Sequence, residues 1–267
     1  MQTEDNISKE LGHWRVVGAS VLGTSHQKVK QLCQDAHHWE ILPEGILLAA
    51  VADGAGSARL GKVGAIVASQ TAVETIRAKY GAMTARGQIA IDENTWQSLL
   101  ASAVENAKTA VEEEAIACQV RARDLATTLI IVVATPELIA AVQIGDGVAV
   151  AGDKAGNIVA LTAPQRGEYV NETIFLVSPD VLDNIHVNIW RGSVANIAIL
   201  SDGLQMLALE MNGGKPYAPF FFPMFQFVAG VTDESEAKEQ LVAFLRSERI
   251  STRTDDDLTL LLATIVN

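Results

Sequence analysis

The chain has 267 residues, of which 49% are hydrophobic and 19% charged, a composition that supports one large domain with a sizeable buried core. Its formal net charge of -12 argues against a general nucleic-acid binder, because such proteins need a basic surface to displace counterions from phosphates. No stretch reaches the roughly 18 apolar residues of a membrane span, and the polar N-terminus MQTEDNISKE lacks the apolar segment of a signal peptide. We therefore expect a single cytoplasmic domain over residues 1–267, with no nucleic-acid or membrane partner.

Apolar runs rich in β-branched residues predict strands at 14–21, 46–53 and 125–134. Between the second and third runs, apolar residues recur at helical spacing on both sides of a break that contains glycines. This pattern predicts two successive helices, with Asp92 or Asn94 as the cap of the second.

From residue 125 onward, strand follows strand. The runs LIIVVA, LIAAVQI, VAVAG and IVAL alternate with turn residues, which predicts an antiparallel meander over 125–162. A helix is predicted at 232–247, with Asp233 as its cap, and a last strand at 258–266. The segment 163–194 has no clean periodicity, and we interpret it as a variable flap near the functional site. This order of elements favours an α+β layered architecture over an alternating βαβ sheet.

Residues 51–64 read VADGAGSARLGKVG and allow two interpretations. The glycines and Lys62 have the spacing G-x-x-x-x-G-K of a phosphate-binding loop, whereas Asp53 ends an apolar strand and can hold a metal. A phosphate-binding loop needs Ser or Thr after the lysine, and this chain has Val63. Such a loop also normally belongs to a parallel sheet, so the predicted meander counts against it.

Carboxylates follow or precede several of the apolar runs. Asp53 and Asp202 each end a strand and are followed by glycine, while Asp35, Asp146 and the triplet 255–257 flank other apolar segments. A single Asp-Gly pair is most often only a turn. Several carboxylates at one edge of a core repel one another unless cations compensate them. Without His or Cys partners they select magnesium, manganese or calcium, and a pair of such ions favours attack of water on a phosphoryl group.

The motifs CQDA, VADGAGS, ATTLIIV, VQIGDG, ILSDGL and DDLTLLL, in this order, resemble those of the metal-dependent type 2C serine/threonine protein phosphatases. The similarity covers nearly the whole chain and is strongest to the bacterial branch of the family. It implies a central antiparallel β-sandwich flanked by helical layers, in agreement with the order of elements. It also implies hydrolysis of phosphoserine and phosphothreonine by water that bridges two divalent metal ions, Mn2+ or Mg2+. A phosphoprotein substrate and a cognate protein kinase are the implied partners.

The resemblance assigns metal-site roles to individual residues. Asp53 would bridge the two metals, and Gly54 would offer its backbone carbonyl to one of them. Asp146 matches the family position that is linked with a third, weaker metal. Asp35 would act close to the metal pair, through water.

Two more metal ligands come from later in the chain. Asp202 and Asp256 would ligate the second metal. The family pattern is Asp, then Asn or Asp, then an apolar residue, then Thr or Ser, and this pattern favours Asp256 over the alternative, Asp255.

Two departures from the family pattern concern the catalytic residues. Lys30 stands where the family commonly has an arginine that grips the substrate phosphate, and lysine lacks the bidentate fork. Gln34 stands where the family often has Glu. His26 is a candidate for phosphate contact or proton donation to the leaving group, although a lone histidine is more often structural. These departures leave open a phosphoprotein-binding relative with impaired catalysis, and a nucleotide hydrolase that uses Lys62 is a less favoured alternative.

Overall fold

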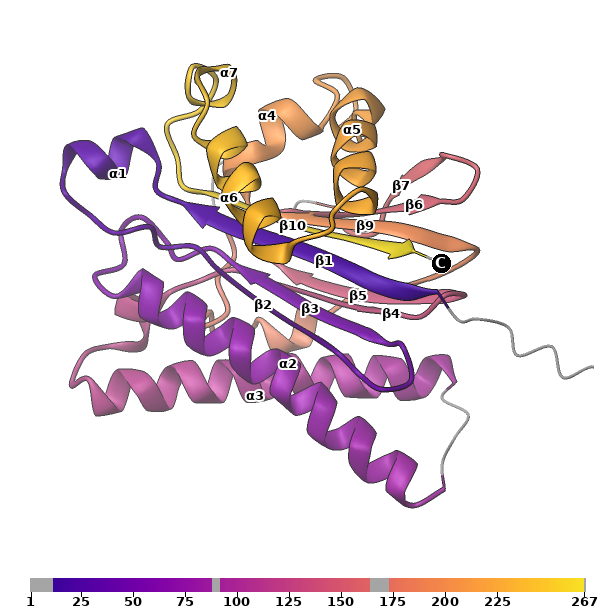
Figure 1. Cartoon of the computed structure of the whole chain (residues 1–267). Helices are drawn as coiled ribbons and strands as arrows, with labels where there is room; N and C mark the ends of the chain where they lie inside the picture. The colour runs from indigo at the N-terminus through magenta and orange to yellow at the C-terminus, as the bar shows by residue number, and fades with distance from the viewer. Residues whose placement is uncertain (1–11, 88–91, 164–172, 267) are drawn as a thin grey trace, which may run out of the picture.

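The computed structural model describes residues 12–87, 92–163 and 173–266, and in these ranges the strands form two antiparallel sheets packed face to face (Figure 1). The first sheet contains, in spatial order, β1 (His13–Val21), β10 (Leu258–Val266), β9 (Val194–Leu200), β6 (Val148–Asp153) and β7 (Ile158–Ala160). The second sheet contains, in spatial order, β2 (Ala36–Ile41), β3 (Leu47–Ala52), β4 (Leu129–Ala134), β5 (Leu138–Ile144) and β8 (Val187–Arg191).

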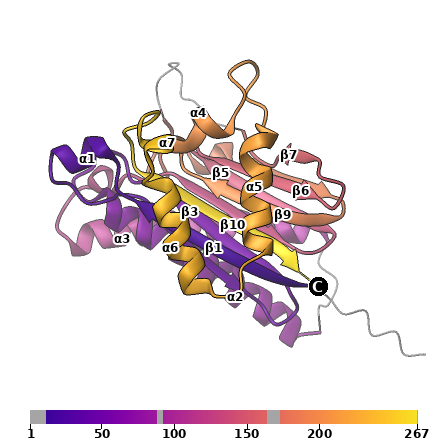
Figure 2. The same cartoon turned by 45° about the horizontal axis from the view of Figure 1, so that its top comes forward.

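Helices cover the outer face of each sheet, as Figure 1 and Figure 2 show. The second sheet is covered by α2 (Gly61–Ala85) and α3 (Glu93–Ala117), and the first by α5 (Ala218–Ala229) and α6 (Glu234–Leu245). The short elements are α1 (Thr24–Lys28), α4 (Gln205–Ala208), α7 (Glu248–Ser251) and the 3-10 turns Ala122–Leu125, Leu182–Asn184 and Asp202–Leu204. The predicted sandwich flanked by helical layers is confirmed. No helix in the described part of the chain is long and apolar enough to cross a bilayer.

β3 shows why the central strands have unbroken apolar sequences. Its alternate residues Leu47, Ala49 and Val51 belong to the core between the sheets. The residues between them, including Leu48 and Ala50, belong to the core between the second sheet and its helices. Both faces of the strand are therefore buried, and polar residues have no place on it.

Both predicted helix caps are present. Asp92 Oδ1 accepts a hydrogen bond from the Thr95 amide at 2.8 Å, and Asp233 Oδ1 accepts one from the Glu236 amide at 2.9 Å. Each carboxylate satisfies an amide that the first turn of the helix leaves unpaired, which fixes where α3 and α6 begin.

The predicted meander over 125–162 is wrong at its centre. β4 pairs with β5, but β5 then pairs with β8, while β6 pairs with β7 and β9 of the other sheet. The chain therefore crosses between the sheets at residues 145–147. Periodicity could not reveal this crossing, because β5 and most of β6 are buried on both faces and so carry no sign of their pairing partner. The strand predicted from 125 also begins later, at Leu129, after a 3-10 turn.

The segment 163–194, interpreted as a flap, contains one strand of the sandwich. β8 occupies its end and pairs with β5. Residues 164–172 of this interpretation lie outside the described residues. β2 was likewise not predicted from the sequence, because its AHHWEI run is only half-buried and mixes polar with apolar residues.

The glycines of VADGAGSARLGKVG allow close packing at the start of α2. A Cβ atom on Gly54 would lie 2.4 Å from the carbonyl carbon of Gly61, and one on Gly64 would lie 2.0 Å from the carbonyl oxygen of Leu125. β3, which leads into this segment, pairs antiparallel with both neighbours. The spacing that resembles a phosphate-binding loop is therefore explained by packing, and nothing in the structure favours the nucleotide-hydrolase alternative.

Candidate active site

Asp53 follows β3 at one end of the sandwich and is fixed through its backbone. Its carbonyl accepts hydrogen bonds from the Thr128 amide at 2.8 Å and from the Thr127 hydroxyl at 3.0 Å, and its amide donates to the Thr128 hydroxyl at 3.0 Å. Burial, followed by the nearby charges of Asp35 and Asp202, raises the pKa of Asp53 well above its ordinary value. Asp53 therefore lies at the centre of a group of carboxylates.

Asp35 lies directly before β2, and only 4% of its surface is exposed. Its Oδ2 accepts a hydrogen bond from the Ser201 hydroxyl at 2.7 Å, whereas its buried Oδ1 has no hydrogen-bond partner in the described part of the chain. Burial raises the pKa of Asp35 to about 7, against the hydrogen bonds from Ser201 and Thr259, which lower it. One oxygen of this carboxylate is therefore held by the protein, and the other is open to a ligand or a proton.

A chain of hydroxyl groups continues from Ser201 through the sandwich. The Thr259 amide donates to Ser201 Oγ at 2.9 Å, Thr259 Oγ1 lies 2.6 Å from Ser20 Oγ, and Ser20 Oγ lies 2.9 Å from His37 Nδ1. Burial lowers the pKa of His37 to about 4, so its ring is neutral near pH 7. Gly18 makes room for this ring, because a Cβ atom there would lie 2.8 Å from it.

Asp202 begins the 3-10 turn that follows β9. Burial raises the pKa of Asp202 to about 6, and the charges of Asp256 and Asp146 add to this rise. Its Oδ1 is buried and has no partner among the described residues. Asp146 lies in the turn that crosses between the sheets, where its Oδ2 accepts a hydrogen bond from Thr173 Oγ1 at 2.8 Å and its carbonyl accepts one from the Gln205 side chain.

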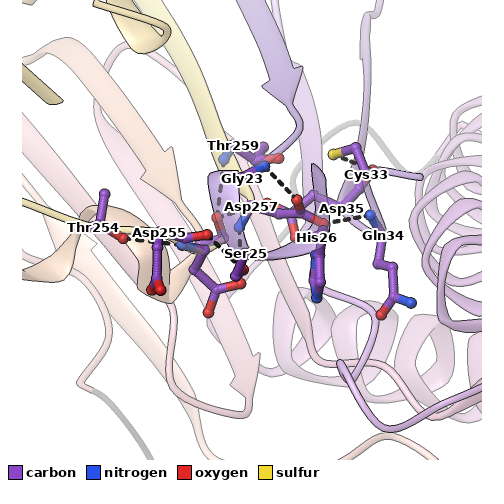
Figure 3. A network of polar contacts seen from close by, with 12 residues as sticks. Gly23, Ser25, His26, Cys33, Gln34, Asp35, Thr254, Asp255, Asp257 and Thr259 are labelled. Carbon is purple, nitrogen blue, oxygen red and sulfur yellow. Dashed lines mark hydrogen bonds and ion pairs between the residues drawn. The ribbon is translucent and has the colours of Figure 1, made fainter. Parts of the chain in front are cut away.

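The members of the acidic triplet 255–257 have different roles. Asp257 is 2% exposed, and its two oxygens accept hydrogen bonds from the amides of Gly23 at 2.7 Å and Gln34 at 2.6 Å (Figure 3). Asp257 therefore ties the start of β10 to the segments before α1 and β2. Its own amide donates to Asp256 Oδ1 at 2.8 Å, and burial, with the charge of Asp257, raises the pKa of Asp256.

His26 borders the carboxylates, whereas Lys30 does not contact them. His26 Nδ1 lies 2.9 Å from Asp257 Oδ2, and a Cβ atom on Gly56 would lie 3.6 Å from His26 Nε2, so the ring reaches from Asp257 to the loop after Asp53. Lys30 follows α1 with a left-handed φ of 58° and is exposed. Within the described ranges, its ammonium group forms no hydrogen bond or ion pair.

The side chain of Gln34 lies against the loop that contains Gly54. With its amide nitrogen directed at the loop, as hydrogen-bond complementarity requires, it donates to the carbonyls of Gly54 at 3.0 Å and Ala55 at 2.9 Å. A carbonyl oxygen has two lone pairs, so this bond leaves Gly54 able to bind a metal ion as well.

The donor set suits hard divalent cations. Burial and mutual repulsion raise the pKa values of four carboxylates, those of Asp35, Asp53, Asp202 and Asp256. No Lys or Arg of the described residues forms an ion pair with them. Two of their oxygens are buried and unpartnered. As the side chains stand, no three His, Cys, Asp or Glu residues in residues 12–87, 92–163 and 173–266 converge on one point. Oxygen ligands that repel one another nevertheless fit Mg2+ or Mn2+, which would offset their charge.

Sequence reasoning missed the residues that hold these carboxylates in place. These residues are Ser201, Thr259, Asp257 and the pair Thr127 and Thr128. Each lies at or next to a strand end, within one of the motifs ATTLIIV, ILSDGL and DDLTLLL. A hydroxyl or carboxylate next to an apolar strand end is the signal that could have identified them.

Known proteins share both the sequence pattern and the fold. The family model for protein phosphatase 2C matches residues 22–246. Serine/threonine-protein phosphatase 3 of Escherichia coli (strain K12) is 34% identical over 256 residues, which cover 94% of this chain and 98% of that protein. The chain therefore belongs to the protein phosphatase 2C family, a family of metal-dependent protein phosphatases.

Solved structures of low sequence identity share the fold. Serine/threonine phosphatase Stp1 from Staphylococcus aureus matches with a TM-score of 0.63 at 14% identity, over 97% of this chain and 98% of that chain. PppA of Pseudomonas aeruginosa matches with a TM-score of 0.60 at 17% identity, over 96% of this chain and 99% of that chain.

Proposed function

We propose that this chain hydrolyses phosphoserine and phosphothreonine in proteins and that Asp53, Gly54, Asp202 and Asp256 hold two divalent metal ions for this reaction. The observation that carries the proposal is the group of buried carboxylates with raised pKa values and unpartnered oxygens, with which no Lys or Arg of the described residues forms an ion pair. When bound, the metals supply activation of water and stabilisation of the charge that develops on the phosphoryl group. Asp146, beside Asp202, is proposed to hold a third, weaker ion.

The side chains around this site position the reactants and move protons. Asp35 has one oxygen fixed by Ser201, and its open Oδ1 can orient the attacking water and accept its proton. His26 presents Nε2 to the loop after Asp53, which suits proton donation to the leaving oxygen. Lys30, which is exposed and has no ion pair within the described ranges, is proposed to reach the substrate phosphate as a point charge.

The partners and location follow from this activity. A phosphoprotein is the proposed substrate, and a protein kinase that acts on the same protein is the proposed counterpart. Cys33 and Cys118 are free thiols in the structure, which supports the proposal of a reducing, cytoplasmic location.

Hydrolysis of an aryl phosphate, measured with and without manganese, tests the proposal. The parent should require the metal, and Asp53→Asn and Asp256→Asn should each lose roughly 100-fold or more in kcat. Asp255→Asn changes the neighbouring carboxylate by the same chemistry and should stay close to the parent. Activity that persists without metal, or in both Asp53→Asn and Asp256→Asn, would overturn the proposal. Metal binding without hydrolysis in the parent would instead favour the impaired relative.

A further inference from the structure

A cavity of about 370 Å³ adjoins the proposed metal site. Its lining residues come from α1 and the residues before it, the end of α6, α7 and the start of β10. Asp256 forms part of its wall, so a substrate that placed its phosphate at the metal site would pass over the cavity. Its volume is at the lower end of the range of small-ligand sites, roughly 300–1,000 Å³, which suits one side chain and not a folded segment.

The wall of this cavity combines an apolar surface with a single cation. Leu22, Leu245 and Leu258 supply the apolar surface, and Thr24 and Thr254 supply hydroxyl groups. An aliphatic stem would bury apolar area there, while a polar end group would meet the hydroxyls. The cavity therefore suits a side chain with an apolar stem and a polar head.

Arg246 is the one basic residue among those that line the cavity. It is exposed at the end of α6, and it forms no ion pair among the described residues, even though Asp256 lines the same cavity. A guanidinium group binds a carboxylate through two parallel hydrogen bonds. The chain carries a net charge of -12, so an acidic peptide needs a local cation of this kind to approach the site.

We infer that this cavity is a substrate subsite that takes an acidic side chain near the phosphorylated residue, with Arg246 as its specificity-determining residue. The inference rests on the proposed function, because it identifies the substrate class of the same site. The substrate carboxylate pairs with the Arg246 guanidinium, which offsets its charge beside the like charge of Asp256. Phosphoproteins with Asp or Glu near the phosphorylated residue are therefore the preferred substrates.

Phosphoserine peptides that carry Glu or Gln at each neighbouring position test this inference through kcat/KM with manganese. At one position the parent should prefer Glu over Gln by roughly tenfold, the effect of one charge-assisted pair. Arg246→Gln should abolish this preference, and Arg246→Lys should retain part of it. Arg249→Gln is the matched control, because Arg249 carries the same charge on α7 but does not line the cavity. The preference should survive in this control.

Two further readouts separate the inference from the proposed function. Arg246→Gln should hydrolyse an aryl phosphate at the parent's rate, since that small substrate does not reach the cavity. Fluorescence anisotropy of the labelled Glu and Gln peptides on Asp53→Asn protein measures binding without turnover and should show the same dependence on Arg246. No preference for Glu in either assay, or an equal loss in Arg249→Gln, would overturn the subsite. Absence of metal-dependent aryl phosphate hydrolysis in the parent would overturn the proposed function alone.

Discussion

Asp35 is oriented by a chain of hydroxyl groups, and within the described ranges it has no cationic partner. Ser201 donates to one of its oxygens, Thr259 donates its amide to Ser201, and Ser20 links Thr259 to His37. A buried hydrogen bond to an ionised group contributes more to stability than a hydrogen bond between neutral groups, because the buried charge is otherwise poorly solvated. Removing one hydroxyl of the chain should therefore affect the carboxylate at its end.

Ser201→Ala should lower kcat by roughly tenfold, because Asp35 loses the donor that fixes its orientation. It should also lower the free energy of unfolding by about 1–3 kcal/mol, because the Thr259 amide loses its acceptor. Ser69→Ala is the control: Ser69 is equally buried, but its hydroxyl bonds to the Ala65 and Ile66 carbonyls within α2 and to none of the carboxylates of the site. The control should alter thermal stability alone, and an equal loss of kcat in both variants would contradict the positioning role of Ser201.

The raised pKa of Asp35 predicts a pH dependence of stability in metal-free protein. Its ordinary pKa is 3.8 and its folded pKa is about 7, so between these values the folded chain binds more protons than the unfolded chain. The free energy of unfolding therefore falls as the pH rises through this window. His37 acts in the opposite direction, because its pKa falls from 6.5 to about 4 on folding.

Comparison of the parent with Asp35→Asn separates these two effects. With metal removed by a chelator, the free energy of unfolding of the variant does not fall through ionisation of residue 35, because asparagine has no charge to gain. Its melting temperature should therefore gain on that of the parent as the pH rises from about 5 to about 7.5. A difference between the two proteins that stays constant with pH would contradict the raised pKa.

The site could be predicted in part because metal-ligating carboxylates leave a mark in the sequence. Asp53 and Asp202 each follow an apolar strand, and an acidic residue beside a buried run is easy to see. Asp257 could not be distinguished from Asp256 in this way, because adjacent residues share the same sequence surroundings. Only the fold shows that the oxygens of Asp257 bind the amides of Gly23 and Gln34.

At the scale of elements, α2 shows how closely a helix can pack beside the site. Gly64 lies in its first turns, where the helix passes over the carbonyl of Leu125, in the 3-10 turn before β4. Gly81, near the other end of the same helix, has no neighbouring atom within 4 Å of the place where a Cβ atom would be. One helix therefore contains a glycine that packing requires and one that it does not.

Gly64→Ala should lower the free energy of unfolding by about 2–3 kcal/mol, because its Cβ atom would lie 2.0 Å from the carbonyl oxygen of Leu125. In a chain of this size, that corresponds to a drop of roughly 4–12 °C in melting temperature. Gly81→Ala should instead raise stability by about 0.5–1 kcal/mol, because alanine favours helix where space is free. Thermal unfolding checks both variants, and changes of the same sign would contradict this explanation.

Strand pairing was the part of the fold that local sequence could not supply. An unbroken apolar run predicts a strand such as β3 well, because a strand that is buried on both faces has apolar residues on both faces. The same property hides which neighbour the strand pairs with, so the crossing at 145–147 between β5 and β6 was missed. That crossing brings Asp146 to the end of the sandwich near Asp202.

Over the whole molecule, the fold gathers carboxylates that destabilise it when no cation is bound. Asp53 leaves the second sheet and Asp202 leaves the first, so the site depends on how the two sheets stack. Burial and mutual repulsion raise the pKa values of both groups, which means that their charged forms are disfavoured by folding. Function and stability should therefore respond in opposite directions when one charge is removed.

Asp53→Asn should make the metal-free protein more stable by about 1–2 kcal/mol, because an amide of similar shape removes the buried charge that repels Asp35 and Asp202. Manganese should raise the melting temperature of the parent, since a ligand that binds only the folded state stabilises it by about RT ln(1 + [L]/Kd). The variant should lose this metal-dependent rise together with phosphatase activity. Asp183→Asn, at an exposed aspartate of the 3-10 turn Leu182–Asn184, is the control and should keep the metal response of the parent. A metal-free Asp53→Asn protein that melts below the parent would show that the Asp53 carboxylate stabilises the fold. It would contradict the prediction that removing this charge raises stability while it abolishes activity.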